Sequence, residues 1–391
     1  MGPVDEDVTP ARAVADRMAE AARAWLDMLD AEQRQVATGA VPAADASDAE
    51  RRRWFYTPTD HGGLTMHQQR PAQQRGAMRL VSTGLSTAGY VTVATVMGLE
   101  NVLDHVEGFV TRFDRERGRD PGLYYLRVFG DPGGAMPWGW RFGGHHVSLN
   151  NLVVGGAVVA TTPCFLGADP ATSPLLGGAV LRPLARVEDL ARDLIRSLQP
   201  GLAARAVLLP RAPSDLVTAN RASIAHGDRV IPLAAVWRDE RFPDPVEQAK
   251  LQTLSDAINE ASGFDDADHA AVEYTTTPKG VPAAALDIAQ REMLRALLGT
   301  FLGRVPDGVS PLDRYVDDAA LDAVHLAWAG STEPAAPHYY RLQDPRLLLE
   351  WDNTQRGANH AHSVWRDPTA DFGLDVLAAH RAAHHSGARK D

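Results

Sequence analysis

The sequence has very little cysteine, since Cys164 is the only one among its 391 residues. A single cysteine excludes an internal disulfide and a metal site made of several thiolates. As a nucleophile Cys164 would need a base beside it, and the surrounding TTPCFLG stretch offers none. We therefore expect a buried, unreactive thiol in a protein kept in a reducing compartment.

Long apolar runs are missing as well. The run within NLVVGGAVVATT, which starts at residue 151, is far shorter than the roughly 20 residues that span a bilayer, so we expect no transmembrane helix. The first residues, MGPVDEDVTP, carry acids where a secretory signal carries positive charge. We therefore expect a cytoplasmic protein without a membrane partner.

Positive charge is scarce, because 39 lysines and arginines stand against 50 acids and the net charge is -11. Such a chain repels a phosphate backbone, so we expect no nucleic-acid partner. Several catalytic motifs are also absent, namely H-E-x-x-H, G-x-S-x-G, the phosphate-binding G-x-x-x-x-G-K-[ST] and G-x-G-x-x-G after a strand. Their absence disfavours zincin proteases, α/β hydrolases, nucleotide hydrolases and Rossmann dehydrogenases.

The length of the chain exceeds what one hydrophobic core usually supports, so we expect two domains or two fused halves. Helical periodicity is clear in RVEDLARDLIRSL, from residue 186, and short runs such as LYYLRVFG predict strands. Helices before and after groups of adjacent strands favour an α+β fold. The expected parts, packed as one compact unit, are an N-terminal helical arm (1–55), a first half (56–165), a helical connecting region (166–262) and a second half (263–391).

Two stretches of the sequence resemble each other. Tyr-Tyr pairs occur at 124–125 and 339–340, and each is soon followed by an arginine and by Asp-Pro. Twenty residues after each pair comes a histidine, His145 or His360, which gives the same offset of 215 residues. We expect an internal duplication with two pseudo-equivalent halves, each made of helices and short antiparallel or mixed strands. Such halves would meet across a pseudo-twofold axis, and a homodimer is a further arrangement that we consider.

Histidines are the side chains in these stretches that bind metals most readily. We expect WGWRFGGHHVSLN, residues 138–150, to be a single strand, which places His145 on the face of Val147 and Leu149 and His146 on the other face. Three histidines leave an open position for water or substrate on a transition metal such as zinc, iron or copper. The predicted ligands are His145, His360 and His362, with His146 in a supporting catalytic role. Histidines that simply fill the core, or that act without metal, are the alternatives.

Two carboxylates stand in the strand predicted for LLLEWDNTQ. Alternation places Glu350 and Asp352 on one face with Leu348, opposite Leu347 and Leu349. A partly buried carboxyl group is shifted toward its neutral form, which suits a general acid or base. We therefore consider both as catalytic groups, with a solvated strand face as the alternative.

Aromatic, cationic and amide side chains near these histidines are candidates for substrate binding. A planar guanidinium suits a substrate carboxylate, and amide groups in a loop can orient a polar substrate. Core packing, an ion pair and turn closure are the alternatives. The residues concerned are Trp140, Arg141, Tyr340 and Asn359.

Three motifs, PWGWRFGGHHVSLN, RLLLEWDNTQRGANHAHSVWRD and DFGLDVLAAH, resemble the bacterial family catalogued as domain of unknown function 3500. The resemblance covers most of the chain from about Trp54 onward. It implies a shared fold and carries no established activity.

These observations favour a metal-dependent enzyme that acts on a small-molecule substrate. Hydrolysis by a metal-bound water is the simplest chemistry, because an open histidine site lowers the pKa of that water toward neutrality. An iron or copper oxidoreductase is a second reading, since the ligand type alone does not choose the metal. A metal-free protein that binds a small molecule in a cleft between the halves is a third.

Overall fold

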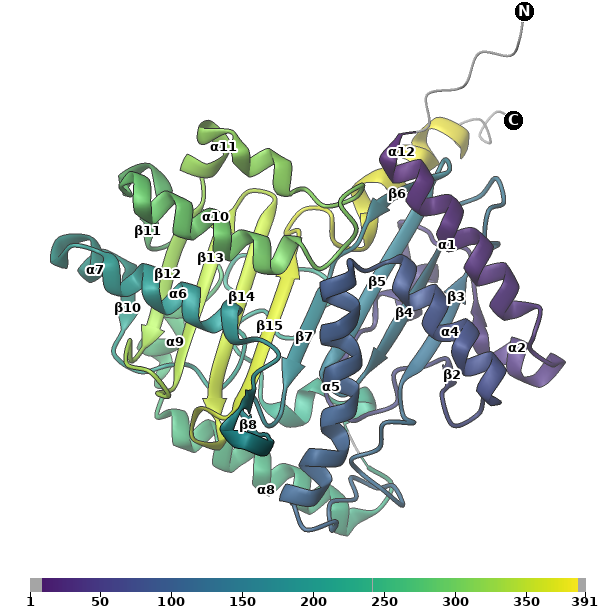
Figure 1. Ribbon diagram of the computed structural model, residues 1–391, viewed down its shortest axis with the longest axis horizontal. Coiled ribbons are helices and arrows are strands. Elements are labelled where there is room, and N and C mark those ends of the chain that lie inside the picture. The colour runs from purple at the N-terminus through teal and green to yellow at the C-terminus, as the bar shows by residue number, and fades with distance from the viewer. Residues whose placement is uncertain (1–8, 241, 386–391) are drawn as a thin grey trace, which may run out of the picture.

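A computed structural model describes residues 9–240 and 242–385 (Figure 1). Within them a mixed sheet of 13 strands runs through the whole molecule. Neighbouring strands are antiparallel, except that β1 runs parallel to β3 and β10 parallel to β12. The main path across the sheet is β1 (Thr38–Gly39), β3 (Tyr125–Phe129), β4 (Trp138–Gly144), β5 (Val147–Val154), β7 (Cys164–Ala168), β15 (His360–Arg366), β14 (Leu347–Gln355), β13 (His338–Asp344), β12 (His325–Gly330) and β10 (Val207–Leu209).

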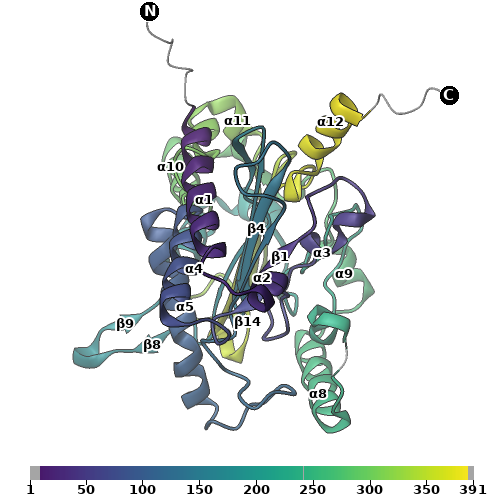
Figure 2. The ribbon, with the colours of Figure 1, turned by 90° about the vertical axis from the view of Figure 1, so that its right-hand side faces the viewer.

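Five short strands lie beside this path. Three of them join the main sheet, where β2 pairs with β3, β6 with β5 and β11 with β12. The other two form a small hairpin that projects from the body of the protein (Figure 2). These strands are β2 (Leu64–Thr65), β6 (Ala157–Ala160), β11 (Val281–Pro282), β8 (Ser173–Pro174) and β9 (Val180–Leu181).

Helices cover both faces of the sheet, which confirms the expected mixture of helices and strands (Figures 1 and 2). One face carries α1 (Pro10–Leu26), α4 (Pro71–Thr83), α5 (Thr87–Val106), α6 (Ala185–Ser197) and α10 (Ile288–Leu302). The opposite face carries α3 (Ala49–Arg52), α8 (Pro245–Ser262) and α9 (Asp266–Val272). The remaining helices are α2 (Ala31–Ala37), α7 (Pro200–Ala206), α11 (Asp318–Asp322) and α12 (Leu374–His385). None of the helices in the described ranges is both long and apolar enough to pass through a bilayer.

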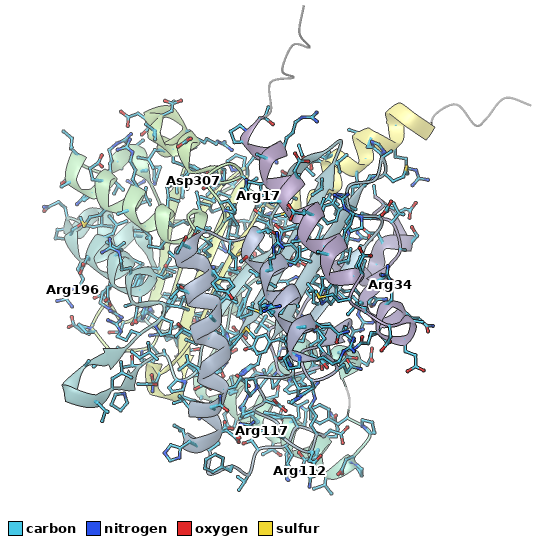
Figure 3. All side chains as sticks on the ribbon, turned by 45° about the vertical axis from the view of Figure 1, so that its right-hand side comes forward. Arg17, Arg34, Arg112, Arg117, Arg196 and Asp307 are labelled. Atoms are coloured by element: carbon cyan, nitrogen blue, oxygen red, sulfur yellow. The ribbon has the colours of Figure 1, made fainter. Side chains whose placement is uncertain are left out.

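Apolar periodicity explains why these helices form where they do. In α6 the residues Val187, Leu194 and Ile195 are buried on one face while charged residues occupy the other. At the start of α10, Asp287 and Gln290 form a capping box that satisfies the first backbone N–H groups of the helix. Charged side chains that face solvent are spread over the molecule, with Arg34 and Arg196 at opposite edges (Figure 3).

The strand order is symmetric about the central pair β7–β15. Starting from that pair, the order β5, β4, β3, β1 on one side matches β14, β13, β12, β10 on the other. In both directions the outermost strand is parallel to its neighbour. The central pair is antiparallel, with His362 opposite Gly167 and Trp365 opposite Cys164.

The stretch 138–150 is not a single strand, so the expectation from its sequence was wrong. Strand β4 ends at Gly144, His145 and His146 form a two-residue turn, and β5 starts at Val147. His146 has a φ of 64°, a left-handed conformation that belongs to turns and not to strands. Period-two alternation therefore does not decide which way the two histidines point.

The offset of 215 residues does not match equivalent strands either. The first Tyr-Tyr pair leads into β3, which lies next to the short strand β1, whereas the second pair lies within β13, between β12 and β14. His145 is a turn residue, while His360 is the first residue of β15. The spacing is equal, but it is made of different elements in the two places.

Trp140 and Tyr340 are core residues and not substrate contacts. Both rings are buried on the sheet face beneath α1, α4, α6 and α10. The hydroxyl of Tyr340 donates a 2.7 Å hydrogen bond to the carbonyl of Val187 in α6. The ring of Trp140 fills the space beside Gly84, where a Cβ atom would come within 2.5 Å of it.

Arg141 points to the other face of the sheet and holds the segment 50–62 in place. Its guanidinium donates to the carbonyl oxygens of Glu50 at 2.7 Å and His61 at 2.6 Å, and also to that of Arg53. Burial lowers the pKa of Arg141 to about 10, which leaves it charged at neutral pH. Its donors are used by backbone acceptors, so the expected role in binding a substrate carboxylate is wrong.

Replacing Arg141 with methionine should destabilise the protein strongly. The variant keeps the length of the side chain but leaves several buried carbonyl groups without a donor, at about 1–3 kcal/mol for each unsatisfied group. We expect Arg141→Met to lower the free energy of unfolding in urea by about 3 kcal/mol or more. Arg127→Met is the matched control, because Arg127 is more exposed and contacts only Thr38 and Glu50. Equal losses in the two variants would contradict the structural role of Arg141.

Candidate metal centre

Three imidazole rings converge at the end of the central strand pair. The Nε2 atom of His146 lies 2.8 Å from Nε2 of His360 and 3.3 Å from Nε2 of His362. His146 comes from the β4–β5 turn, while His360 and His362 start β15. Residues two apart in a strand share a face, so β15 directs both of its histidines to the same place.

The backbone around His146 fixes the position of its ring. Its N–H donates to the carbonyl of Tyr56 at 3.0 Å, and its carbonyl accepts from the N–H of Gly167 at 2.8 Å. Gly167 also gives the ring its space, because a Cβ atom there would lie 2.8 Å from Cδ2 of His146. The turn, β7 and β15 are thus locked together at this point.

Two carboxylates stand behind the histidines. Nδ1 of His362 is 2.8 Å from an oxygen of Asp215, and Nδ1 of His360 is 3.5 Å from Asp169. Asp215 in turn accepts a 3.0 Å hydrogen bond from the hydroxyl of Tyr56. A carboxylate on the far nitrogen fixes the tautomer of a metal-bound histidine and makes it a better ligand. Both Nε2 atoms are thereby left free to bind at the centre.

The spacing of the three Nε2 atoms fits a metal ion. Nitrogens bound at 2.0–2.1 Å to one tetrahedral ion are about 3.3 Å apart, which is close to the separations found here. Burial and the neighbouring cationic groups hold the pKa of His146 and His360 well below the usual value, so these ligands stay neutral. For His362, burial favours the neutral form, but Asp215 and Asp352 outweigh it and raise its pKa. These three residues also form one of the two groups in the described chain with metal-ligand spacing.

His145 does not join this cluster, although the sequence suggested it as a ligand. Its ring stacks on that of His146 at 3.8 Å, and its Nδ1 lies 2.5 Å from a carboxyl oxygen of Glu100 in α5. Its Nε2 faces Nη1 of Arg119 at 3.5 Å. The places expected for the two histidines are therefore exchanged, because both lie in a turn and not in a strand.

Glu350 anchors the backbone and does not face the cavity. Its carboxylate accepts hydrogen bonds from the N–H of Val217 at 2.9 Å and the hydroxyl of Tyr339 at 2.7 Å, and it also contacts Thr218. The predicted alternation is correct, since Glu350 shares its sheet face with Leu348. The catalytic role proposed for Glu350 is not supported, because its acceptor sites are used by groups of the protein.

Asp352 lies close to the cluster but behind it. It forms the second group with metal-ligand spacing, together with Asp215 and His362. Burial, followed by repulsion from Asp215, raises the pKa of Asp352 to about 8. It does not line the cavity described below, so it acts on the site through His362 and Asp215.

Asn359 closes a loop and does not face a substrate. Its side-chain oxygen accepts a 2.7 Å hydrogen bond from the N–H of Thr172, and its carbonyl accepts one from Ala171 at 2.9 Å. These bonds tie the residue before β15 to the loop after β7. Asn359 thus helps to position His360, the next residue in the chain.

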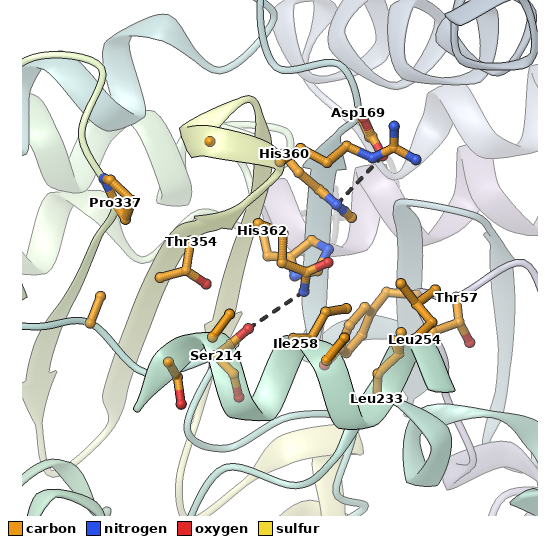
Figure 4. A pocket seen from close by; sticks show the side chains of 18 of the residues that line it. Thr57, Asp169, Ser214, Leu233, Leu254, Ile258, Pro337, Thr354, His360 and His362 are labelled. Carbon is orange, nitrogen blue, oxygen red and sulfur yellow. Dashed lines mark hydrogen bonds and ion pairs between the residues drawn. The ribbon is translucent and has the colours of Figure 1, made fainter. Parts of the chain in front are cut away.

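A cavity of about 660 Å³ opens in front of the histidines. His145, His146, His360 and His362 form its inner end, and α8 forms the opposite wall (Figure 4). Its lining does not include Trp140, Arg141, Tyr340 or Asn359, the residues expected to bind substrate. The volume is within the range of small-molecule sites.

Sequence reasoning missed several residues of this site. Asp169 and Asp215 orient two of the histidines, Glu100 holds His145, and Arg119 lines the cavity. Asp169 had a local signal, because it follows directly after the strand in CFLGAD. Asp215 and Glu100 had none, since each meets its histidine only through the tertiary fold.

The comparisons with known proteins agree with the resemblance seen in the motifs. No curated protein and no solved structure matches the chain. A family model described as "Protein of unknown function (DUF3500)" matches residues 11–374, which include every residue of the histidine cluster. The chain therefore belongs to the DUF3500 family.

Proposed function

We propose that this protein is a metal-dependent enzyme that acts on a small molecule, with His146, His360 and His362 as ligands of one transition-metal ion. The observation that carries the proposal is the approach of three Nε2 atoms to within metal-ligand spacing at the inner end of a cavity. Buried imidazoles with no shared ion would gain nothing from this convergence. The metal-free binding cleft needs Trp140 and Arg141 on a cavity wall, and they lie elsewhere.

Hydrolysis is the chemistry that the arrangement supports best. Three protein ligands leave a coordination position for water, and a bound divalent ion such as zinc lowers the pKa of that water toward 7. Neutral imidazoles also bind iron and copper, so an oxidoreductase is the second candidate. Identification of the metal separates the two.

His145 is the side chain best suited to act as a base beside the metal. Arg119 has only hydrogen-bond donors, so Nε2 of His145 faces it as an acceptor, and Nδ1 carries the hydrogen that Glu100 accepts. Burial lowers the pKa of His145 well below its usual value. The neutral ring is thus available as a proton acceptor through the whole neutral range.

We also propose that the two sides of the sheet are copies related by an offset near 200 residues, and not 215. Support comes from β4 and β13, where Arg141 and Arg341 are both buried arginines that donate to backbone carbonyl oxygens. At the same offset the turn residue His146 corresponds to Arg346, which pairs with Asp367. Only one of the two turns would then carry histidines, so two copies would share a single metal centre.

Metal analysis tests the proposal directly. After removal of metal with a chelator and reloading with Zn²⁺, we expect the parent to retain about one equivalent by elemental analysis. His146→Ala and His360→Ala should each retain less than about a tenth of that. Asp215→Asn should keep the ion but bind it about 10–100-fold more weakly, the usual effect of losing a carboxylate behind a ligand.

The control is His145→Ala, which removes the neighbouring imidazole but none of the three ligands. This variant should retain the same zinc as the parent. Retention of zinc by His360→Ala at the parental level, or the absence of zinc from the parent, would contradict the proposal.

The role of His145 has its own test, based on hydrolysis of a chromogenic aryl ester by the zinc-loaded protein. A positioned base contributes about 10²–10⁴-fold, so His145→Asn should lower kcat by that factor without loss of metal. Since the pKa of His145 is lowered, activity in the parent should not fall through its protonation until the pH is well below 6.5. A rate within threefold of the parent would exclude His145 as the base.

A further inference from the structure

Helix α8 has two apolar faces, and only one of them packs against the protein. Leu251 and Ser255 are buried against the segment 233–236, where Oγ of Ser255 accepts a 3.2 Å hydrogen bond from the N–H of Ala234. These contacts hold the helix in place. The second face consists of Leu254, Ala257, Ile258 and Ala261.

This second face looks into the cavity. Its members follow the i, i+3, i+4, i+7 spacing of a helix face that packs on something, yet Leu254 is 42% exposed and no protein side chain covers it in the described chain. Figure 4 shows Leu254 and Ile258 of α8 across the cavity from His360 and His362. The face therefore offers apolar contact area to whatever occupies the cavity.

Other apolar side chains extend this surface. Leu233, Phe113 and Trp237 also line the cavity, and the rings of Phe113 and Trp237 are 5.0 Å apart. Aromatic and aliphatic walls of this kind bury the body of a ligand, while a few polar groups orient it. Here the polar groups are the histidines at the inner end.

The arginines in the cavity wall are already paired with acids. Arg119 is held by Glu107 through two hydrogen bonds of 2.8 and 2.9 Å, and Arg356 contacts both Glu107 and Asp169. The third, Arg211, pairs with Asp268. An anionic substrate would have to break one of these pairs, and the partner carboxylate would then be left without its cation.

We infer that the substrate is an uncharged carbonyl compound with an apolar body, such as an ester or amide of an alkyl or aromatic group. This inference rests on the proposed metal site, where the carbonyl would lie. The body would extend along the apolar face of α8, and the cavity of about 660 Å³ has room for it.

Hydroxamates with different tails test this, because the hydroxamate group chelates the metal in each of them. Calorimetry on the zinc-loaded full chain would compare acetohydroxamate, octanohydroxamate and the monohydroxamate of succinate. We expect octanohydroxamate to bind at least 30-fold more tightly than acetohydroxamate, because its tail is buried against α8. The succinate derivative should bind no more tightly than acetohydroxamate.

A pair of variants in α8 locates the effect. Leu254→Asp puts a charge on the cavity face and should weaken octanohydroxamate at least tenfold while acetohydroxamate binds as before. Val246→Asp is the matched control, since Val246 is 61% exposed on the same helix and does not line the cavity. It should change neither affinity.

The outcomes separate this inference from the proposed metal site. If acetohydroxamate binds but the octyl tail adds nothing, or Leu254→Asp has no effect, the substrate class is wrong and the metal site stands. Tighter binding of the succinate derivative would likewise overturn the inference in favour of an anionic substrate. If the parent binds neither zinc nor any hydroxamate, both proposals fail together.

Discussion

The antiparallel pairing of β7 with β15 joins the two sides of the sheet, and the histidine cluster depends on it. In this register His362 lies opposite Gly167, the residue whose missing side chain leaves room for the ring of His146. The same ladder brings Asp169, just after β7, beside His360 at the start of β15. A slip of one residue would turn the side chains of β15 to the opposite face and disperse the cluster. The chemistry therefore requires the correct register of one strand pair.

Burial around this pair decides which groups are charged. The histidines lie where water is largely excluded, so three of the four rings favour their neutral form, and only His362, held by Asp215, is shifted toward protonation. The arginines near the cavity keep their charge because each has an acidic partner. Such a site combines neutral ligands with local charge balance. That combination suits a divalent cation and an uncharged organic partner, since neither adds an uncompensated negative charge.

The sequence was a good guide to features that depend on local pattern. The face of α6 and the alternation of Glu350 with Leu348 follow directly from residue spacing. It was a poor guide to the turn at His145 and His146, because no Asn-Gly or similar pair marks that turn. Buried arginines such as Arg141 look like binding residues in a sequence, and only the fold reveals that backbone carbonyls use their donors. The convergence of His146 with His360 and His362 needed the strand order itself, which no local signal contains.

The distance along the chain between the ligands has a consequence for how the centre is made in the cell. His146 and His360 are 214 residues apart. At a synthesis rate of about 5–20 residues per second, His146 leaves the ribosome's catalytic centre roughly 10 to 40 seconds before His360 is added. During that time one imidazole alone would hold a metal ion only weakly. Loading of the ion would thus follow the closing of the sheet, so that metal content reports complete assembly of the chain.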